Sequence, residues 1–174
     1  MPKISARQID VDENKVMLEL QKNSDDSIDI LAKRCGFSRQ KVWKIIKKFE
    51  KNKTIWGYHA VIEIERFHQK NFILLIKKSN APASEILDII VSRELEKNAE
   101  NLNVVIVSSS YLHGSFDWQI TFNAGDIREA KKFCETVNRL YQGHIGEIVL
   151  LEEIFPVKTC SIQNPNIKKL KQIV

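Results

Sequence analysis

Few cysteines occur in this sequence, and their spacing matches neither a disulfide framework nor a zinc site. The 174 residues contain three cysteines, Cys35, Cys134 and Cys160, and no CxxC motif. An odd and scattered set of this kind is typical of reduced thiols in a folded protein. We therefore expect neither disulfides nor a structural metal.

Long apolar runs and a secretory leader are also lacking. No stretch approaches the roughly 18 apolar residues that a membrane span requires. The N-terminus, MPKISARQID, has no apolar core of the signal-peptide type, which predicts a cytoplasmic location. A composition of 43% hydrophobic and 28% charged residues is ordinary for a folded soluble protein.

Signatures of catalysis are scarce. His59, His68, His113 and His144 have no metal-ligand spacing, there is no Gly-rich phosphate loop, and no Ser or Cys lies in a recognisable nucleophile motif. These absences favour a protein that is not an enzyme and has no cofactor. An enzyme remains the first alternative, because the ferredoxin-like domain predicted below supports many chemistries.

Positive charge is concentrated in one short segment. Residues 31–53 contain nine Lys or Arg and one acidic residue, Glu50, and carry a net charge of +8, whereas the rest of the chain carries −3. A local basic patch on a slightly acidic protein indicates a polyanionic partner, most commonly nucleic acid.

The first third of the sequence predicts three helices. A first helix of about three turns follows the possible caps Asp10 and Asp12. Its apolar positions are Val16, Met17 and Leu20. After a polar turn at residues 24–27, a short second helix ends at Gly36, and Ser38 can cap a third helix. Helix, helix, Gly-containing turn and helix is the order of a helix-turn-helix.

The third predicted helix is amphipathic and runs to about Asn52. Its apolar side consists of Val42, Ile45, Ile46 and Phe49. Its opposite side is a polar stripe of Gln40, Lys44, Lys47 and Lys51. The apolar side can pack on the first two helices, which leaves the stripe exposed.

Strands and helices alternate in the rest of the chain. A long strand is predicted from Ile55, because Ile62 and Ile64 alternate with Glu63 and Glu65, and it is a plausible interdomain linker. Beyond it we predict a strand at 72–78, a helix at 84–98, strands at 104–107 and 118–122 joined by a hairpin, a helix from 126 to 141, and a strand at 147–155. This βαββαβ order is typical of the ferredoxin-like fold.

The predicted fold class is therefore α+β, with four parts. They are a helix-turn-helix domain at residues 1–54, a linker strand at 55–67, a ferredoxin-like domain at 68–156 and a C-terminal tail at 157–174. In the tail, Ile167, Leu170 and Val174 indicate a short terminal helix.

Three motifs resemble the Lrp/AsnC family of prokaryotic transcription factors, the leucine- and asparagine-responsive regulators. Residues 31–38, LAKRCGFS, resemble the family's ELAKRVGLS-like stretch, residues 55–58, IWGY, resemble its I-x-G-Y entry to the linker, and residues 114–117, GSFD, resemble its G-x-[FY]-D hairpin. The tail after Pro156 is longer than the family pattern. The resemblance implies a winged-helix-like DNA-binding domain and a C-terminal domain for effector binding and oligomerisation.

The third helix is the predicted DNA-binding element. The second helix of a helix-turn-helix enters the major groove with its N-terminal residues nearest the bases, where Arg39 suits a guanine and Gln40 an adenine. The lysines are better suited to phosphates. The predicted DNA-binding residues are Ser38, Arg39, Gln40, Lys41, Lys44, Lys47, Lys48 and Lys51. The alternative is a helix whose exposed lysines only solvate the protein.

Three aromatic residues near this helix have two interpretations each. Trp43 either stacks on Arg39 or a sugar, or packs at the edge of the small core. Trp56 and Tyr58 are expected to be packing or dimer-contact residues.

Because such regulators read two half-sites, we expect a homodimer, and the resemblance implies that tetramers or octamers are common.

The hairpin HGSFD is the predicted effector site, with residues His113, Gly114, Ser115, Phe116 and Asp117. The resemblance implies that the matching turn helps form a pocket for a small effector, typically an amino acid, between C-terminal domains. A ligand carboxylate can approach backbone N–H groups at the glycine, and the aspartate can accept a hydrogen bond from an ammonium group. The alternative is an ordinary turn in which the aspartate holds its own backbone.

The function predicted from these features is sequence-specific DNA binding by a transcription regulator. Its expected partners are double-stranded DNA, further copies of itself and a small amino-acid ligand, with no membrane and no metal. The alternative is an effector-independent architectural protein, which would keep the fold and compact DNA without specificity.

Overall fold

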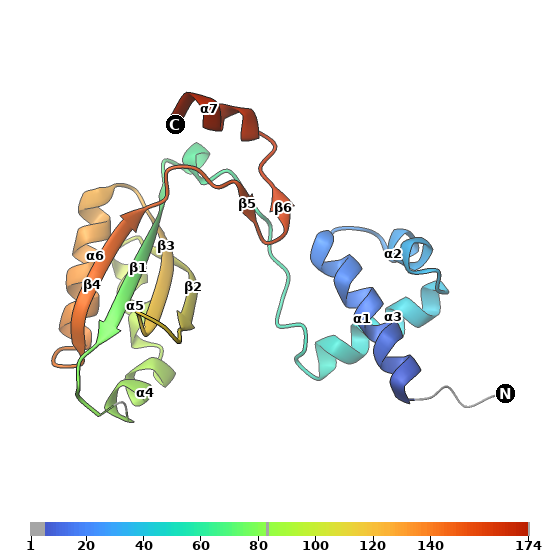
Figure 1. Ribbon diagram of the computed structural model, residues 1–174, viewed down its shortest axis with the longest axis horizontal. Coiled ribbons are helices and arrows are strands. Elements are labelled where there is room, and N and C mark those ends of the chain that lie inside the picture. The colour runs from blue at the N-terminus through green and yellow to red at the C-terminus, as the bar shows by residue number, and fades with distance from the viewer. Residues whose placement is uncertain (1–5, 83, 174) are drawn as a thin grey trace. The chain divides into compact units, whose positions relative to one another are not determined.

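The computed structural model describes residues 6–82 and 84–173, which form two compact units (Figure 1). The first unit contains the chain up to Val61 together with the tail from Pro156 onward. The second unit runs from Ile62 to Phe155. The tail, predicted as a separate part, therefore belongs to the same compact unit as the N-terminal helices.

Three helices make up most of the first unit. They are α1 (Ala6–Lys22), α2 (Ile28–Cys35) and α3 (Arg39–Lys51). Their apolar sides share a core in which Val16, Cys35 and Val42 are at most 1% exposed. Helix α1 starts before the predicted caps, and Asp12 lies inside it rather than at its start.

Local capping chemistry positions α2 and α3, and the sequence predicts the roles of Gly36 and Ser38 in it. The Ser27 hydroxyl accepts a hydrogen bond from the Ile30 N–H, and the Ser38 hydroxyl accepts one from the Lys41 N–H, each at 3.3 Å. Gly36 ends α2 in the left-handed conformation at φ 65°, where the absence of a side chain removes the usual steric cost. The predicted helix-turn-helix is therefore present.

The predicted linker strand is not formed in the single chain. Residues 56–63 belong to no helix or strand, and they lead into a short 3₁₀ turn, η1 (Ile64–Phe67). A strand needs a neighbour that pairs with its N–H and C=O groups. The alternating Ile and Glu residues satisfy the pattern of a strand, but within the described ranges no strand pairs with them, and the C=O groups of Glu63, Ile64 and Glu65 accept hydrogen bonds within the following turn instead.

The second unit is a four-stranded antiparallel sheet covered on one face by helices (Figure 1). Along the chain it consists of β1 (Lys70–Lys78), α4 (Ser84–Val91), α5 (Glu94–Asn101), β2 (Val105–Tyr111), β3 (Trp118–Ala124), α6 (Ile127–Leu140) and β4 (Ile145–Glu152). The strand order β2-β3-β1-β4 is that of the ferredoxin-like arrangement. The predicted α+β class is confirmed.

One predicted helix is divided into two. Residues 84–98 were expected to form a single helix, but α4 ends at Val91 and α5 begins at Glu94. Arg93 lies between them with φ 56°, a left-handed conformation that breaks the helical hydrogen-bond ladder.

Aromatic side chains fill the core between the sheet and its helices. The Phe122 ring lies 5.6 Å from that of Phe72 and 4.6 Å from that of Phe133, measured between centroids. Trp118 meets Tyr141 edge-on at 5.0 Å. Burial raises the pKa of the Tyr141 hydroxyl well above its ordinary value.

The tail is short but regular. It contains a two-stranded hairpin, β5 (Lys158–Thr159) and β6 (Ile162–Gln163), followed by η2 (Ile167–Lys169) and α7 (Leu170–Ile173). The expected terminal helix thus includes Leu170 and directly follows η2, in which Ile167 is the first residue, whereas Val174 lies outside the described residues. In the part of the chain that the structure describes, no helix is both long and apolar enough to cross a membrane.

Candidate nucleic-acid interface

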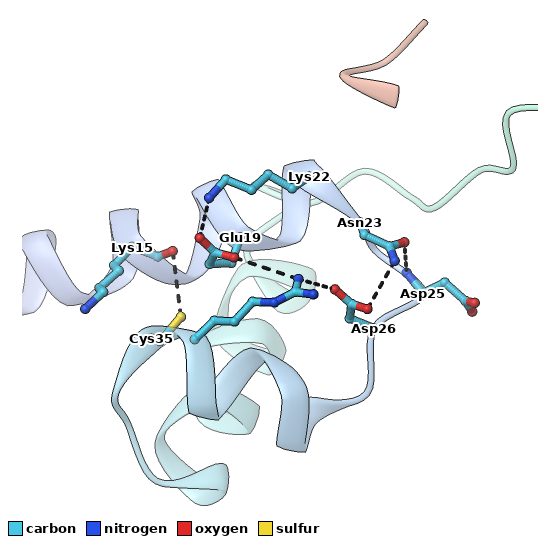
Figure 2. Close-up of polar contacts among 8 residues, drawn as sticks. Lys15, Glu19, Lys22, Asn23, Asp25, Asp26 and Cys35 are labelled. Carbon is cyan, nitrogen blue, oxygen red and sulfur yellow. Dashed lines mark hydrogen bonds and ion pairs between the residues drawn. The ribbon is translucent and has the colours of Figure 1, made fainter. Parts of the chain in front are cut away.

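Polar contacts around the turn between α1 and α2 hold the helix-turn-helix together (Figure 2). Lys22 donates to Glu19 at 2.5 Å, and this hydrogen bond holds the pKa of Glu19 below its ordinary value. Asn23 donates to Asp26 at 3.1 Å. Arg34 lies 2.5 Å from Asp26 and 3.9 Å from Glu19, so this member of the basic segment is used to join the two helices.

Two lysines of α3 are paired with carboxylates of α1. Lys41 Nζ lies 2.6 Å from Asp12 Oδ2 and also 3.9 Å from the centre of the Phe37 ring. Lys48 Nζ lies 2.6 Å from Glu13 Oε1. Both carboxylate side chains are shielded, at 10% and 14% exposure, so these pairs are screened less than fully solvated ones. Both lysines contribute to the packing of α3 on α1.

The other flank of α3 carries weaker, exposed pairs. Arg39 lies 3.4 Å from Asp29, and both side chains are more than half exposed. An ion pair in such surroundings contributes little and can exchange for another anion. Lys47 donates to Glu50 at 2.6 Å, and this hydrogen bond holds the pKa of Glu50 below its ordinary value.

The centre of the polar stripe has unpaired positive charge. Gln40, Lys44 and Lys51 are exposed, and among the described residues neither of these lysines has an ion pair. They lie opposite the buried side of α3, where Val42 is fully buried. The helix therefore presents a polar stripe in which Lys44 lies about one turn and Lys51 about three turns beyond Gln40.

Aromatic residues near α3 are largely accessible. Trp43 is 47% exposed and Trp56 is 95% exposed. Tyr58 donates its hydroxyl hydrogen to Glu50 at 3.1 Å. Partial burial, and to a smaller extent this hydrogen bond, raise the pKa of its phenol. This contact ties the start of the linker to the end of α3.

The HGSFD residues come together in one turn between β2 and β3, but Asp117 is used structurally. Its Oδ2 accepts a hydrogen bond from the Lys78 N–H at 2.9 Å, and its own N–H donates to the Ile76 C=O at 2.9 Å. His113, Gly114 and Ser115 are exposed. In the single chain one carboxylate oxygen is thus committed to the backbone at the end of β1, rather than to the backbone of the turn itself.

A further observation limits the chemistry available to the described residues. In the described ranges no group of three His, Cys, Asp or Glu side chains is placed to hold a metal ion.

The acidic partners Asp12 and Glu13 were not predicted to contribute to the interface, because they lie 29 and 35 residues before the lysines they contact. An acidic pair inside an otherwise ordinary helix gave no local signal of this role.

Comparison with known proteins agrees with this geometry. Residues 13–55 match a family model described as a winged helix-turn-helix DNA-binding domain. The leucine-responsive regulatory protein of Haemophilus influenzae is 25% identical over 142 residues, which is 78% of each chain. The chain is therefore similar to a regulator of the Lrp/AsnC type over most of its length. Residues 13–55 form a DNA-binding domain of the helix-turn-helix type, in agreement with the position of α1, α2 and α3.

Solved structures with the same fold include Lrp/AsnC regulators. An AsnC family transcriptional regulator from Agrobacterium tumefaciens has a TM-score of 0.59 at 17% identity, covering 85% of this chain and 92% of that one. A transcriptional regulator from Neisseria meningitidis, solved as a complex with L-Met, has a TM-score of 0.63 at 15% identity, covering 94% and 98%. These similarities extend over both units of the chain.

Proposed function

We propose that this protein is a transcription regulator of the Lrp/AsnC type and that it binds specific DNA sequences by placing the first turn of α3 in the major groove. The observation that carries the proposal is the exposed stripe of α3, in which Lys44 and Lys51 have no ion pair among the described residues. Arg39 and Gln40 lie at the N-terminal end of that helix, where base edges are read. Lys44 and Lys51 follow them along the helix and bind the phosphate backbone.

The ion pairs refine the roles within the predicted set. Ser38 caps α3 and fixes where it begins, while Lys41 and Lys48 hold it against α1. Arg39 and Lys47 leave their exposed carboxylate partners for DNA at low cost, because such pairs are weak in water.

Footprinting at matched salt tests this proposal against the architectural alternative. A regulator protects discrete segments of a promoter and leaves unrelated DNA of equal length unprotected. Uniform coverage of both DNA molecules at the same protein concentration would instead support compaction without specificity. Selection from random DNA then defines the bases that α3 reads.

Self-association is the second part of the proposal, and the uncovered face of the sheet supports it. Ile73 pairs with Leu151 and Leu75 pairs with Val149 across β1 and β4, on the face opposite the buried core. Leu151 is 44% exposed in the single chain. A dimer through this face brings two helix-turn-helix units to one operator.

Modulation by an amino acid at the β2–β3 turn is the third part. The L-Met complex of the Neisseria relative supports this part of the proposal by showing an amino acid bound within the same fold. One oxygen of Asp117 holds the Lys78 N–H, and its other oxygen lies 3.8 Å from Lys78 Nζ. That second oxygen is the acceptor we assign to a ligand ammonium group.

The variant Asp117→Asn is expected to lose the response to the effector and keep the fold. The amide oxygen still accepts a hydrogen bond from the Lys78 N–H, whereas the charge that attracts an ammonium group is gone. Thermal unfolding with each of the common amino acids measures the ligand-induced rise in Tm for both proteins. An equal rise in the variant, or no rise with any amino acid in the unmodified protein, would contradict an effector site at this turn.

A further inference from the structure

The C-terminal tail is a second concentration of positive charge in the first unit. From Pro156 to the C-terminus the sequence has four lysines and no Asp or Glu. The tail adds +4 to a unit whose N-terminal part carries +5, whereas the second unit carries −4. Charge of one sign is therefore collected in the unit that contains α3.

Internal hydrogen bonds give the tail a defined conformation. Cys160 and Ser161, with φ 46° and 70°, form the tight turn of the β5–β6 hairpin. Asn164 then closes the segment, because its backbone N–H donates to the Val157 C=O at 3.1 Å and its side chain donates to the Pro156 C=O at 2.8 Å. The lysines that follow thus extend from a braced segment.

A contact with the linker attaches the hairpin to the rest of the first unit. Cys160 Sγ lies 3.7 Å from Nε2 of His59, eight residues after the end of α3. Cys160, Ser161 and Ile162 also line a shared depression with α1 residues Met17 and Leu20. The tail therefore packs against the helix-turn-helix unit.

The tail lysines have the properties of phosphate ligands. Lys158, Lys168, Lys169 and Lys171 are all exposed. A lysine ammonium group is a compact charge that binds phosphate without demanding one orientation.

We propose that the tail is a second duplex-DNA contact, in which Lys158, Lys168, Lys169 and Lys171 bind backbone phosphates flanking the segment read by α3. This inference rests on the proposed function, because it requires the first unit to lie on DNA. The contact contributes affinity and salt dependence rather than sequence preference, since phosphates are the same at every base pair.

The test compares two triple variants of the full-length protein with equal changes in charge. One replaces Lys168, Lys169 and Lys171 with Gln, and the control replaces the exposed Lys97, Lys131 and Lys132 of the second unit with Gln. DNA binding is measured by fluorescence anisotropy over a series of salt concentrations on duplexes with long flanks. We expect the slope of log K against log salt to become shallower by about 1 to 3 per bound chain in the tail variant, and to stay unchanged in the control.

Further arms separate charge from structure and from the proposed function. A variant with Arg at the three tail positions keeps the charge, so it is expected to keep the slope. The inference would be overturned if the slope fell equally in the Arg variant or in the control. An unchanged slope in the Gln variant would also overturn it. If a variant of Lys44 and Lys51 loses binding while the tail variants do not, the proposed function stands and the tail contact fails.

Discussion

Replacing Lys44 and Lys51 with Ala is expected to lower DNA affinity by about three orders of magnitude at about 0.1 M salt. Each phosphate contact releases a counterion and contributes about 0.9 to the slope of log K against log salt, so a dimer that loses about four contacts has a slope shallower by about 3.6. Both side chains are exposed on α3 and have no ion pair among the described residues. Anisotropy titrations across a salt series measure both quantities.

The matched control lies on the same helix. Lys41→Ala with Lys48→Ala removes the same charge, but these lysines already face Asp12 and Glu13 at 2.6 Å. We expect a smaller change in slope from this pair and a larger loss of thermal stability, because it removes two ammonium groups that lie 2.6 Å from shielded carboxylates of α1. Equal slopes in the two double variants would show that pairing with the α1 carboxylates does not affect which lysines of α3 bind DNA. Unaltered affinity of the Lys44 and Lys51 variant would rule out α3 as the docking element.

Phe122→Ala is expected to lower the free energy of unfolding of the second unit by about 3–5 kcal/mol. The Phe122 side chain is fully buried, and its ring contacts those of Phe72 and Phe133, so truncation leaves a cavity between β1, β3 and α6. Urea unfolding followed by Trp118 fluorescence, in a background where the other two tryptophans are Phe, measures the loss. The second unit stays folded after this substitution only if its free energy of unfolding is larger than the loss.

A control for this prediction is Val91→Ala. Val91 ends α4 and is 80% exposed, so its truncation removes little buried surface and is expected to change the free energy of unfolding by less than about 0.5 kcal/mol. A loss below about 1 kcal/mol for Phe122→Ala would contradict the assignment of this ring to the centre of the core.

Features governed by neighbouring residues were predictable from the sequence. Ser27, Gly36 and Ser38 each satisfy backbone groups within a few residues, so the bounds of α2 and the start of α3 followed from local chemistry. Asp126 likewise caps α6, where it accepts hydrogen bonds from the N–H groups of Arg128 and Glu129. The two apolar periodicities then determined the order of helices and strands.

Features governed by distant residues were not predictable in the same way. The break between α4 and α5 depends on a left-handed Arg93, a conformation that the residue type does not signal. The division of the α3 lysines into paired and free ones depends on α1 carboxylates that lie far away in the sequence. In the described parts of the chain no strand pairs with the linker residues, which a periodic pattern cannot reveal.

The irregular linker also has a consequence for operator architecture. Eight residues, 56–63, belong to neither helix nor strand. Fully extended, such a segment spans at most roughly 30 Å, which is comparable to one turn of B-DNA. Because Tyr58 and His59 contact other parts of the first unit, the free part of this segment is shorter still, so in the dimer proposed above the separation of the two half-sites would vary only within narrow bounds.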